Sequence, residues 1–441
     1  MTWKKACLSK LKVQHICLIT LWSMLWLSMN AEAHVDSKYY IDFFHKTRLV
    51  FPYIAAIIAA FWLLFRRKKI KMKLWQVGTL GYCCTALISG VSSGTDYSLL
   101  HFHASMICAI IILLFATSIA KDFEHVCEKD LASLLAKTGL VILFLVLMLF
   151  FVRDIFQAIY LGTMNGYAIQ GMAPNQFGME APRSTGNARS AAIIGLSCAI
   201  FCLSPKSKQK ILFFLSCFTF ALLFFYQSRG AFLCLVVSAS FVLFMLPRES
   251  RPQPKLIAKF AFTSLAIYGT ILAAIYFGSV QTGTDSQNIL KVLRYTDPEN
   301  FTSGRIVIWK NGVKEIMESP LIGFGSQADR VRLDKNISNL ALYSLICSGL
   351  FGFAFGALVI ITTLKNIFAL SVVRRYRACT KVKVHFFLAL GIFLFLLTRG
   401  AVENSFALFN IDFLLALPAI WYLNLDPNLA AVIKVNHNNS C

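Results

Sequence analysis

Long apolar stretches recur along the chain and alternate with short polar segments. A helix that crosses a bilayer needs about 20 predominantly apolar residues, and by that criterion the chain offers about twelve candidates. They lie near residues 13–31, 48–65, 74–92, 102–120, 138–152, 190–204, 211–227, 231–247, 258–277, 338–362, 384–398 and 406–424. The pattern therefore predicts an all-α polytopic membrane protein in which residues 1–441 form a single integral membrane domain.

Two segments between these ranges are long, residues 153–188 and residues 278–337, and the topology argued below places both outside. Connections of this length in a compact protein are usually functional or disordered. The second segment contains apolar residues at helical spacing, namely Ile306, Trp309, Val313, Ile316 and Met317. We expect an amphipathic helix there, which either lies at the outer membrane surface or caps the bundle without membrane contact.

The composition excludes an ordinary soluble protein, since 57% of the residues are hydrophobic and only 15% are charged. The formal net charge of +22 comes from short basic clusters between apolar stretches, so membrane topology explains it better than nucleic-acid binding. Four such clusters lie around residues 66–73, 206–210, 248–255 and 374–383. Basic residues that flank spans are usually cytoplasmic, and placing all four clusters inside makes the C-terminus cytoplasmic as well.

The N-terminal residues admit two interpretations. Lys4, Lys5, Lys10 and Lys12 precede an apolar run that ends at Ala31–Ala33, a pattern similar to a secretory signal with its cleavage site. We favour an uncleaved first helix. None of the thirteen cysteines lies in the long exterior segments, which argues against disulfides and against a cysteine metal site.

Ionisable residues are scarce within the apolar stretches, and Asp412 is the one acid that we place in a span, about two turns below the outer surface. The candidate chemistry therefore lies at the outer mouth, where the topology gathers Arg229, Arg305 and Arg399. A guanidinium keeps its charge when partly buried, and its planar fork matches phosphate oxygens. Three arginines suit a lipid pyrophosphate, and the alternative is that each is an ordinary anchor or helix-end residue.

The run from Leu321 to Gly325 is rich in glycine, but it lacks the third glycine and the Lys-Ser/Thr pair of a nucleotide-binding loop. Gly323 and Gly325 instead indicate a turn where the backbone bends or approaches a ligand closely. The chain has no acidic motif of the kind that holds a divalent ion, so we expect neither a metal nor a cofactor.

Several short motifs lie near the predicted outer ends of the later spans. They are Ser228–Ala231, Ser303–Arg305 with Ile308–Trp309, Ser319–Gly325, Ser338–Leu340, Cys347–Gly352, Glu403–Asn404 and Asn410–Asp412, with Gly186–Asn187 as a weaker match. Together these motifs resemble the O-antigen ligase family, whose relatives include the O-antigen polymerases. The resemblance is specific between Ala221 and Asp412, and before that range it rests on little more than the number of spans.

The resemblance implies a multi-pass protein of the bacterial inner membrane, with about twelve helices and a large periplasmic loop. It implies transfer of a glycan from undecaprenyl pyrophosphate to the lipid A-core of lipopolysaccharide at the periplasmic face, with inversion and without a metal. The implied partners are this donor, this acceptor and membrane lipids. The implied catalytic residues are Arg229, Arg305, Arg399, Glu403 and Asp412, and the implied substrate-binding residues are Trp309, Gly323, Gly325, Ser338 and Asn339.

One residue departs from the pattern. The family places a histidine, thought to position or deprotonate the acceptor hydroxyl, where this chain has Ser338, and no histidine occurs between His125 and His385. A general base usually contributes about a hundredfold to ten-thousandfold, so its absence does not by itself abolish transfer. The sequence does not rank the possible substitutes, which are Asp334, Glu403, Asp412, His101 and His103, and it also leaves open a member that has lost activity.

Other functions share part of this pattern. A polymerase uses the same donor and takes a second lipid-linked glycan as acceptor, while transfer to protein is disfavoured because the loop carries no additional domain. A transporter or flippase without covalent chemistry is the alternative from a different class. Such a protein needs ionisable residues or broken helices at mid-membrane, and this chain has few.

Overall fold

The computed structural model describes residues 2–29, 49–66, 72–122, 128–161, 184–202, 209–226, 228–246, 251–281, 305–369 and 380–425. These residues form helices and turns without strands, as the pattern predicts. The helices are α1 (Thr2–Ser28), α3 (Phe51–Arg66), α4 (Leu74–Ser92), α5 (Tyr97–Asp122), α6 (Glu128–Leu161), α7 (Ser184–Cys202), α8 (Gln209–Phe225), α9 (Arg229–Met245), α10 (Pro254–Gln281), α12 (Arg305–Glu318), α13 (Ala328–Leu333), α14 (Leu340–Ala369), α16 (Thr380–Gly400) and α17 (Ile411–Leu423).

Each of the apolar ranges predicted from the sequence overlaps one of these helices. Five helices in the described part of the chain are long and apolar enough to cross a membrane, and seven further apolar helices have 10–17 residues. The number of spans and the side of the membrane on which each loop lies stay predictions. Ala31–Ala33, Ser303, Gly304 and parts of the two long segments lie outside the described residues.

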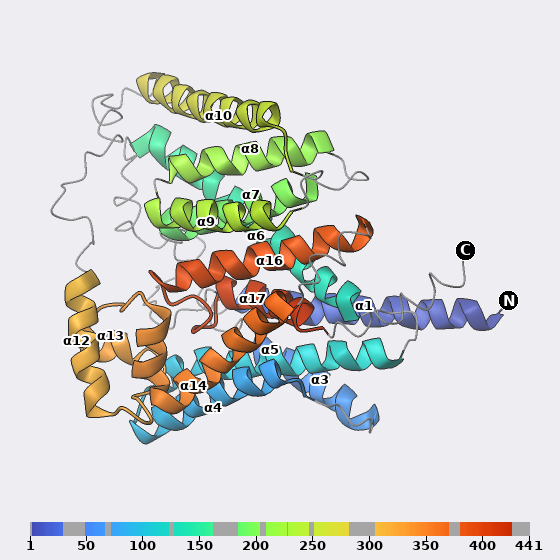
Figure 1. The fold of residues 1–441 in the computed structure, drawn as a ribbon, viewed down its shortest axis with the longest axis vertical. Coiled ribbons are helices and arrows are strands. Elements are labelled where there is room, and N and C mark those ends of the chain that lie inside the picture. Colours follow the sequence, from blue (N-terminus) through green and yellow to red (C-terminus); the bar gives the residue numbers. More distant parts are fainter. Residues whose placement is uncertain are drawn as a thin grey trace.

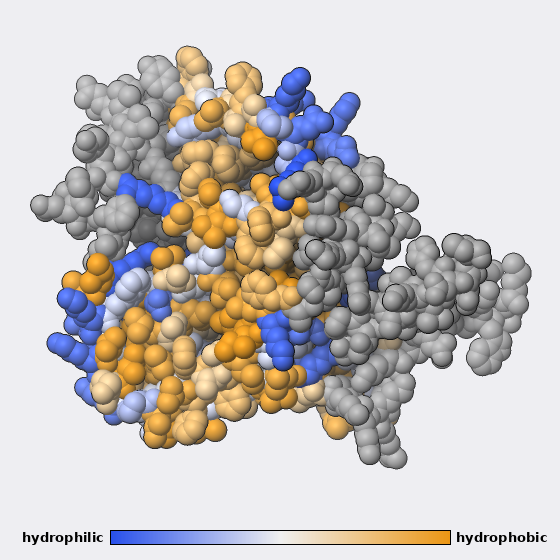
Figure 2. Space-filling view, in the orientation of Figure 1, coloured by the Kyte–Doolittle hydropathy of each residue, from blue (hydrophilic) through white to orange (hydrophobic). Residues whose placement is uncertain are grey.

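The long helices run side by side, and α12 and α13 lie across one end of the bundle (Figure 1). The start of α1 lies at the opposite end (Figure 1). The flank carries many exposed large apolar side chains, for example Phe65, Phe244 and Phe262 at 82%, 73% and 76% exposure. Figure 2 shows this apolar face bordered by hydrophilic residues at both ends of the bundle. Such a surface suits lipid rather than water as its solvent.

Helix α12 is the predicted amphipathic helix, but its apolar stripe is divided between two environments. Ile316 is buried against the bundle, whereas Ile306, Val313 and Met317 are exposed. The division arises because α12 packs on α13 and α14 along one side only. An apolar side that the bundle leaves uncovered favours the membrane-surface interpretation over a cap without membrane contact.

The last helix begins later than predicted. Residues 401–410 form turns, and α17 starts at Ile411 after Asn410, whose side chain accepts hydrogen bonds from the amides of Asp412 (2.9 Å) and Phe413 (3.3 Å). Asparagine is a favoured N-cap because its side chain satisfies amides that have no partner within the helix. Asp412 therefore lies in the first turn of α17, which corrects the expectation of a carboxylate two turns below the outer surface.

Candidate active site

The end of α16 turns back on itself and places two charged side chains close together. The amides of Val402 and Glu403 donate to the carbonyl of Arg399 at 3.0 and 2.8 Å. Glu403 therefore follows Arg399 by one helical turn, at the end of the bundle where α12 lies. The two charged residues of this turn bind different partners.

Arg399 takes part in a buried ion-pair network. Its Nη1 lies 2.7 Å from Oδ2 of Asp412, and Nη1 of Arg189 lies 3.2 Å from Oδ1 of the same carboxylate. The hydroxyl of Ser405 donates to Oδ2 at 2.8 Å. Asp412 is only 1% exposed, so two guanidinium groups share one carboxylate away from solvent. This network joins α7, α16 and α17.

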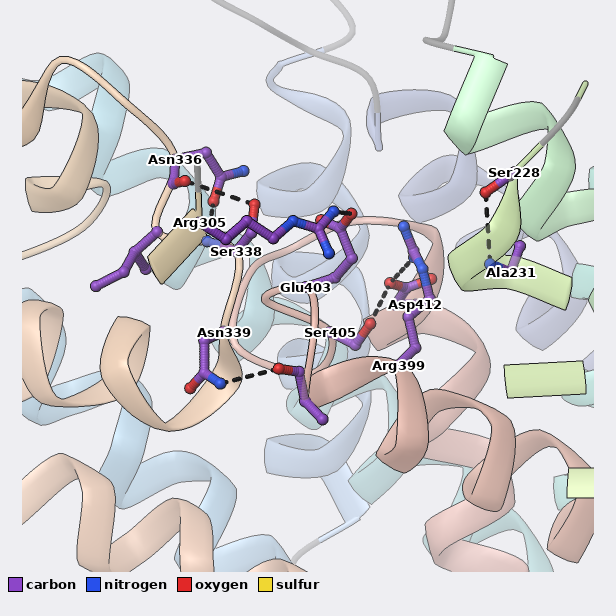
Figure 3. A network of polar contacts seen from close by, with 12 residues as sticks. Ser228, Ala231, Arg305, Asn336, Ser338, Asn339, Arg399, Glu403, Ser405 and Asp412 are labelled. Atoms are coloured by element: carbon purple, nitrogen blue, oxygen red, sulfur yellow. Dashed lines mark hydrogen bonds and ion pairs between the residues drawn. The ribbon is translucent and has the colours of Figure 1, made fainter. Parts of the chain in front are cut away.

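Arg305, the first residue of α12, is held more loosely. Its Nη2 lies 3.5 Å from Oε1 of Glu403, and the two side chains are 34% and 22% exposed. Figure 3 shows this pair beside the Arg399–Asp412 network, nearer to the turn that carries Asn336 and Ser338. Arg305 is thus the accessible arginine of the two, since the side chain of Arg399 is 9% exposed.

Arg229 is exposed at the first position of α9. Ser228 caps this helix by accepting a hydrogen bond from the amide of Ala231 at 3.4 Å, which explains the local role of the Ser-Arg-Gly-Ala motif. α9 packs along α16, and Figure 3 shows its first turn on the far side of Arg399 from Arg305. The three predicted arginines therefore lie at one end of the bundle, with Arg399 more deeply buried than the others.

Several helices begin at this end of the bundle. The N-termini of α9, α12, α14 and α17 are all drawn in the close view of Figure 3. The first turn of a helix carries unsatisfied amides and a partial positive charge, which makes it a favourable place for an anion. Six of the charged residues at this end are four arginines and two carboxylates, namely Arg189, Arg229, Arg305, Arg399, Glu403 and Asp412.

The predicted substrate-binding residues Ser338 and Asn339 form the turn before α14. Oδ1 of Asn339 caps that helix by accepting from the amide of Leu342 at 3.0 Å, and its Nδ2 donates to the carbonyl of Ala401 at 3.0 Å. The backbone of Ser338 is left-handed, with a φ of 46°. The turn is thereby attached to the segment that carries Glu403. Trp309 does not point its indole nitrogen outward, because Nε1 donates to the carbonyl of Ile337 at 2.7 Å.

The predicted glycine turn is bound to an interruption in α14. The interruption is at Gly349, where φ is 59° and ψ is −165°. The carbonyls of Ile346 and Cys347 accept hydrogen bonds from the amides of Phe324 and Gly325, both at 2.8 Å. This pairing of two irregular backbones fixes the end of α12 to the membrane bundle.

Gly323 and Gly325 have left-handed φ values of 77° and 93°. A Cβ atom at Gly323 would lie 2.6 Å from the amide nitrogen of Gly349 and 2.6 Å from the carbonyl oxygen of Ile346. The sequence left open whether these glycines bend the chain or let it approach a ligand. In the structure Gly323 approaches the backbone of α14, and Gly325 approaches the backbone of α4 at Gly90.

Replacing Gly323 with alanine is expected to destabilise the protein by about 3 kcal/mol, because the methyl group adds overlap with α14 to the strain of a left-handed alanine. Gly94→Ala is the matched control, since Gly94 has a φ of 65° with nothing within 4 Å of its Cβ position. The control has only the strain of a left-handed alanine, which costs about 1 kcal/mol. Thermal unfolding of the purified proteins in detergent measures both, and equal losses would contradict the close approach at Gly323.

The two histidines considered as substitute bases are engaged inside the bundle. His103 forms a hydrogen bond with Ser326, and Nδ1 of His101 lies 3.1 Å from the hydroxyl of Tyr53. The rings are 0% and 4% exposed, respectively. Neither ring is presented at the accessible arginine.

The carboxylates considered for the same role differ in their surroundings. Asp412 is enclosed between two guanidinium groups, and Asp334 is exposed at the end of α13. Glu403 is partly exposed and lies beside Arg305. Glu403 is therefore the candidate whose position fits a reaction at this arginine.

Sequence reasoning did not identify Arg189, although the weak Gly186–Asn187 match lies directly before it. It also placed Asp154 in an exterior segment, whereas α6 extends to Leu161 and buries this residue. Oδ2 of Asp154 accepts from the hydroxyl of Tyr226 at 2.9 Å and from Nδ2 of Asn187 at 3.3 Å. The structure thus ties the start of α7 to both neighbouring helices by polar contacts that no local pattern reveals.

Asp329 in α13 is a second carboxylate that the sequence did not single out. It is 1% exposed, and its Oδ2 accepts from the amide of Ile337 at 3.0 Å. Burial raises the pKa of this carboxyl group, and the hydrogen bond from the Ile337 amide opposes the rise. Among the residues that the structure describes, no group of three His, Cys, Asp or Glu residues is arranged to hold a metal ion.

An apolar cavity of about 360 Å³ adjoins the site between α14, α16 and α17. Asn339, Gly400 and Ala401 line it next to the turn that carries Glu403, and Ile360 and Ile420 line it deeper in the bundle. A cavity with an apolar interior and a polar end suits a ligand that is itself amphipathic.

Comparison with known protein families gives a match to the O-antigen ligase family over residues 211–356. This segment runs from α8 into α14 and includes Arg229, Arg305 and the Ser338–Asn339 turn. Arg399, Glu403 and Asp412 lie after it. No curated protein matches the chain. The family resemblance predicted from the motifs is therefore confirmed over residues 211–356.

Proposed function

We propose that this protein transfers a glycan from an undecaprenyl-pyrophosphate donor to the lipid A-core at the periplasmic face of the bacterial inner membrane. The observation that carries the proposal is the partly exposed Arg305–Glu403 pair, which lies next to a buried, net-positive arginine network. The pair supplies a cation that stabilises a leaving pyrophosphate and a carboxylate that accepts a proton. The function is therefore that of a glycosyltransferase of the O-antigen ligase type.

Arg305 and Arg229 are the residues proposed to contact the pyrophosphate, because both are accessible at helix N-termini. Charge that develops on the leaving group is best stabilised by cations that are already in place. Arg399 is proposed to position the site without contacting the pyrophosphate. Its guanidinium is occupied by Asp412, which Arg189 also binds, so these residues fix the ends of α7, α16 and α17 around the site.

The reaction is a single displacement. The acceptor hydroxyl attacks the anomeric carbon of the donor sugar, a new C–O bond forms, and the bond from that carbon to the pyrophosphate oxygen breaks. The leaving pyrophosphate keeps the electron pair of that bond, and Glu403 takes the hydroxyl proton. A displacement of this kind inverts the anomeric configuration, and it requires no metal.

The cavity supports a lipid-linked substrate. Its polar end lies at Asn339 and Ala401, and its apolar lining continues into the bundle. A ligand whose head is at Arg305 therefore has an apolar surface for its tail. Asn339 binds the carbonyl of Ala401 at the polar end, which keeps the two sides of this entrance together.

The polymerase is the nearest alternative, because it uses the same donor and differs only in its acceptor. A transporter is not favoured, since residues 211–356 match a family of ligases and the ionisable groups described above gather at one end of the bundle. These alternatives differ in what the purified protein makes from a labelled donor.

The experiment offers the purified protein a labelled undecaprenyl-pyrophosphate glycan with either lipid A-core or a second lipid-linked glycan. A ligase labels the lipid A-core, a polymerase lengthens the lipid-linked glycan, and a transporter forms no covalent product. Lipopolysaccharide from a deletion strain gives the same distinction in cells. Bare core with accumulating lipid-linked polymer supports the ligase, and a single repeat on the core supports the polymerase.

A further inference from the structure

The peptide groups on both sides of Ile337 are held by side chains from two other helices. Its amide donates to Oδ2 of Asp329 in α13 at 3.0 Å, and its carbonyl accepts from Nε1 of Trp309 in α12 at 2.7 Å. Ile337 is 0% exposed, and a Cβ atom added to Gly312 of α12 would overlap its side chain. We call the Trp309 and Asp329 side chains the Ile337 clamp.

The clamp fixes a strained turn. Ser338 follows Ile337 with a left-handed φ of 46°, a conformation that residues with a side chain adopt only when their surroundings impose it. Its amide donates to Oδ1 of Asn336 at 2.8 Å, and Asn339 then caps α14 and reaches Ala401. The turn is the one that the family resemblance assigns to substrate binding.

The clamp also links this turn to the accessible arginine. Trp309 follows Arg305 by four residues in α12, so the two side chains leave the same face of the helix. Figure 3 shows Arg305 beside Asn336 and Ser338. A shift of Ile337 relative to Trp309 therefore changes the distance between the arginine and the turn.

Asp329 is a buried carboxylate, and its hydrogen bond from the Ile337 amide offsets part of the cost of that burial. A buried carboxylate is costly unless its oxygens are hydrogen-bonded. Oδ1 of Asp329 is buried with no hydrogen-bond partner among the described residues. The Ile337 amide is the strongest of the contacts that favour the charged form of this carboxylate and lower its pKa, ahead of the Arg330 charge and the neighbouring backbone amides.

We propose that Trp309 and Asp329 are positioning residues for glycan transfer, which hold the Ser338–Asn339 turn at a fixed distance from Arg305. Neither residue touches a substrate. The inference rests on the proposed function, in which Arg305 binds the donor pyrophosphate, and it adds that this turn orients the acceptor. A misplacement of about 1 Å in such an arrangement costs up to about a hundredfold in rate.

The test uses the purified full-length protein with labelled donor and lipid A-core. Trp309→Phe keeps the aromatic ring and removes the indole donor, while Asp329→Leu removes the acceptor for the Ile337 amide. Both variants are expected to lower kcat by about tenfold to a hundredfold, with donor KM within about twofold of the wild type. Asp329→Asn retains an oxygen that accepts from the Ile337 amide, so it is expected to restore most of the rate.

Rates are expressed per molecule that binds labelled donor, because a purely structural role would reduce the amount of folded protein and leave this rate unchanged. Wild-type kcat in both Trp309→Phe and Asp329→Leu, or a loss in Asp329→Asn as large as in Asp329→Leu, would overturn the clamp while leaving the proposed function intact. Absence of product with the wild-type protein and both acceptors would overturn the proposed function and the clamp together.

Discussion

Arg305→Ala is expected to lower glycan transfer by about a hundredfold to a thousandfold, the loss that follows removal of one preorganised group that stabilises developing charge. The side chain begins α12, is 34% exposed, and is held by Glu403 at 3.5 Å, so it is available to a phosphate. Arg305→Lys is expected to fall between alanine and the wild type. A lysine keeps the charge but lacks the planar fork that binds two phosphate oxygens at once.

Lys310→Ala is the matched control, because Lys310 is an exposed cation on the same helix. Membranes that contain equal amounts of each variant are compared for lipopolysaccharide capping, and the purified proteins for transfer from labelled donor. Capping at the wild-type level in Arg305→Ala would remove Arg305 from the proposed mechanism. An equal loss in Lys310→Ala would show that the effect comes from the net charge of α12 and not from this position.

The sequence predicts the helices well because their signal is local. Apolar length identifies each long helix, and the stripe from Ile306 to Met317 identifies α12. The helix α13 carries no such signal because it has only six residues, and the interruption at Gly349 carries none because it depends on hydrogen bonds to the distant Pro320 and Leu321. The start of α17 was misplaced for a related reason. The apolar residues of 406–409 resemble a helix, but the cap at Asn410 begins the helix after them.

The candidate site was predicted by residue type but not by pairing. Topology was enough to place Arg229, Arg305 and Arg399 at one end of the bundle. It did not reveal that Arg399 is occupied by Asp412, or that Arg189 shares the same carboxylate from α7. Such pairs join residues far apart in the chain, so a single sequence gives no measure of their distance. The predicted glycine turn illustrates the same limit, because its close neighbours are the backbones of α14 and α4.

The second large effect is on stability, and it concerns the carboxylate of Asp412, which Arg189 and Arg399 both bind. Asp412→Ala is expected to lower the free energy of unfolding by about 3–5 kcal/mol, the cost of breaking a buried ion pair by removing one partner. The alanine leaves the guanidinium groups of Arg189 and Arg399 close together without the charge between them. It also removes the acceptor for the Ser405 hydroxyl. Reversible unfolding in mixed micelles measures the loss.

Glu318→Ala provides the matched control, since Glu318 pairs with Arg332 but is 57% exposed. Exposed pairs contribute about 0–1 kcal/mol, so this variant is expected to unfold almost like the wild type. The double variant Arg189→Met with Asp412→Ala separates charge from packing. If repulsion between uncompensated guanidinium groups dominates, removing one of them recovers part of the loss, and the two changes cost less together than their sum. Additive losses would instead assign the effect of Asp412 to packing and to its hydrogen bonds. In that case the network would hold α7, α16 and α17 together by packing and hydrogen bonds, and neutralisation of the Arg399 charge by Asp412 would not contribute to stability.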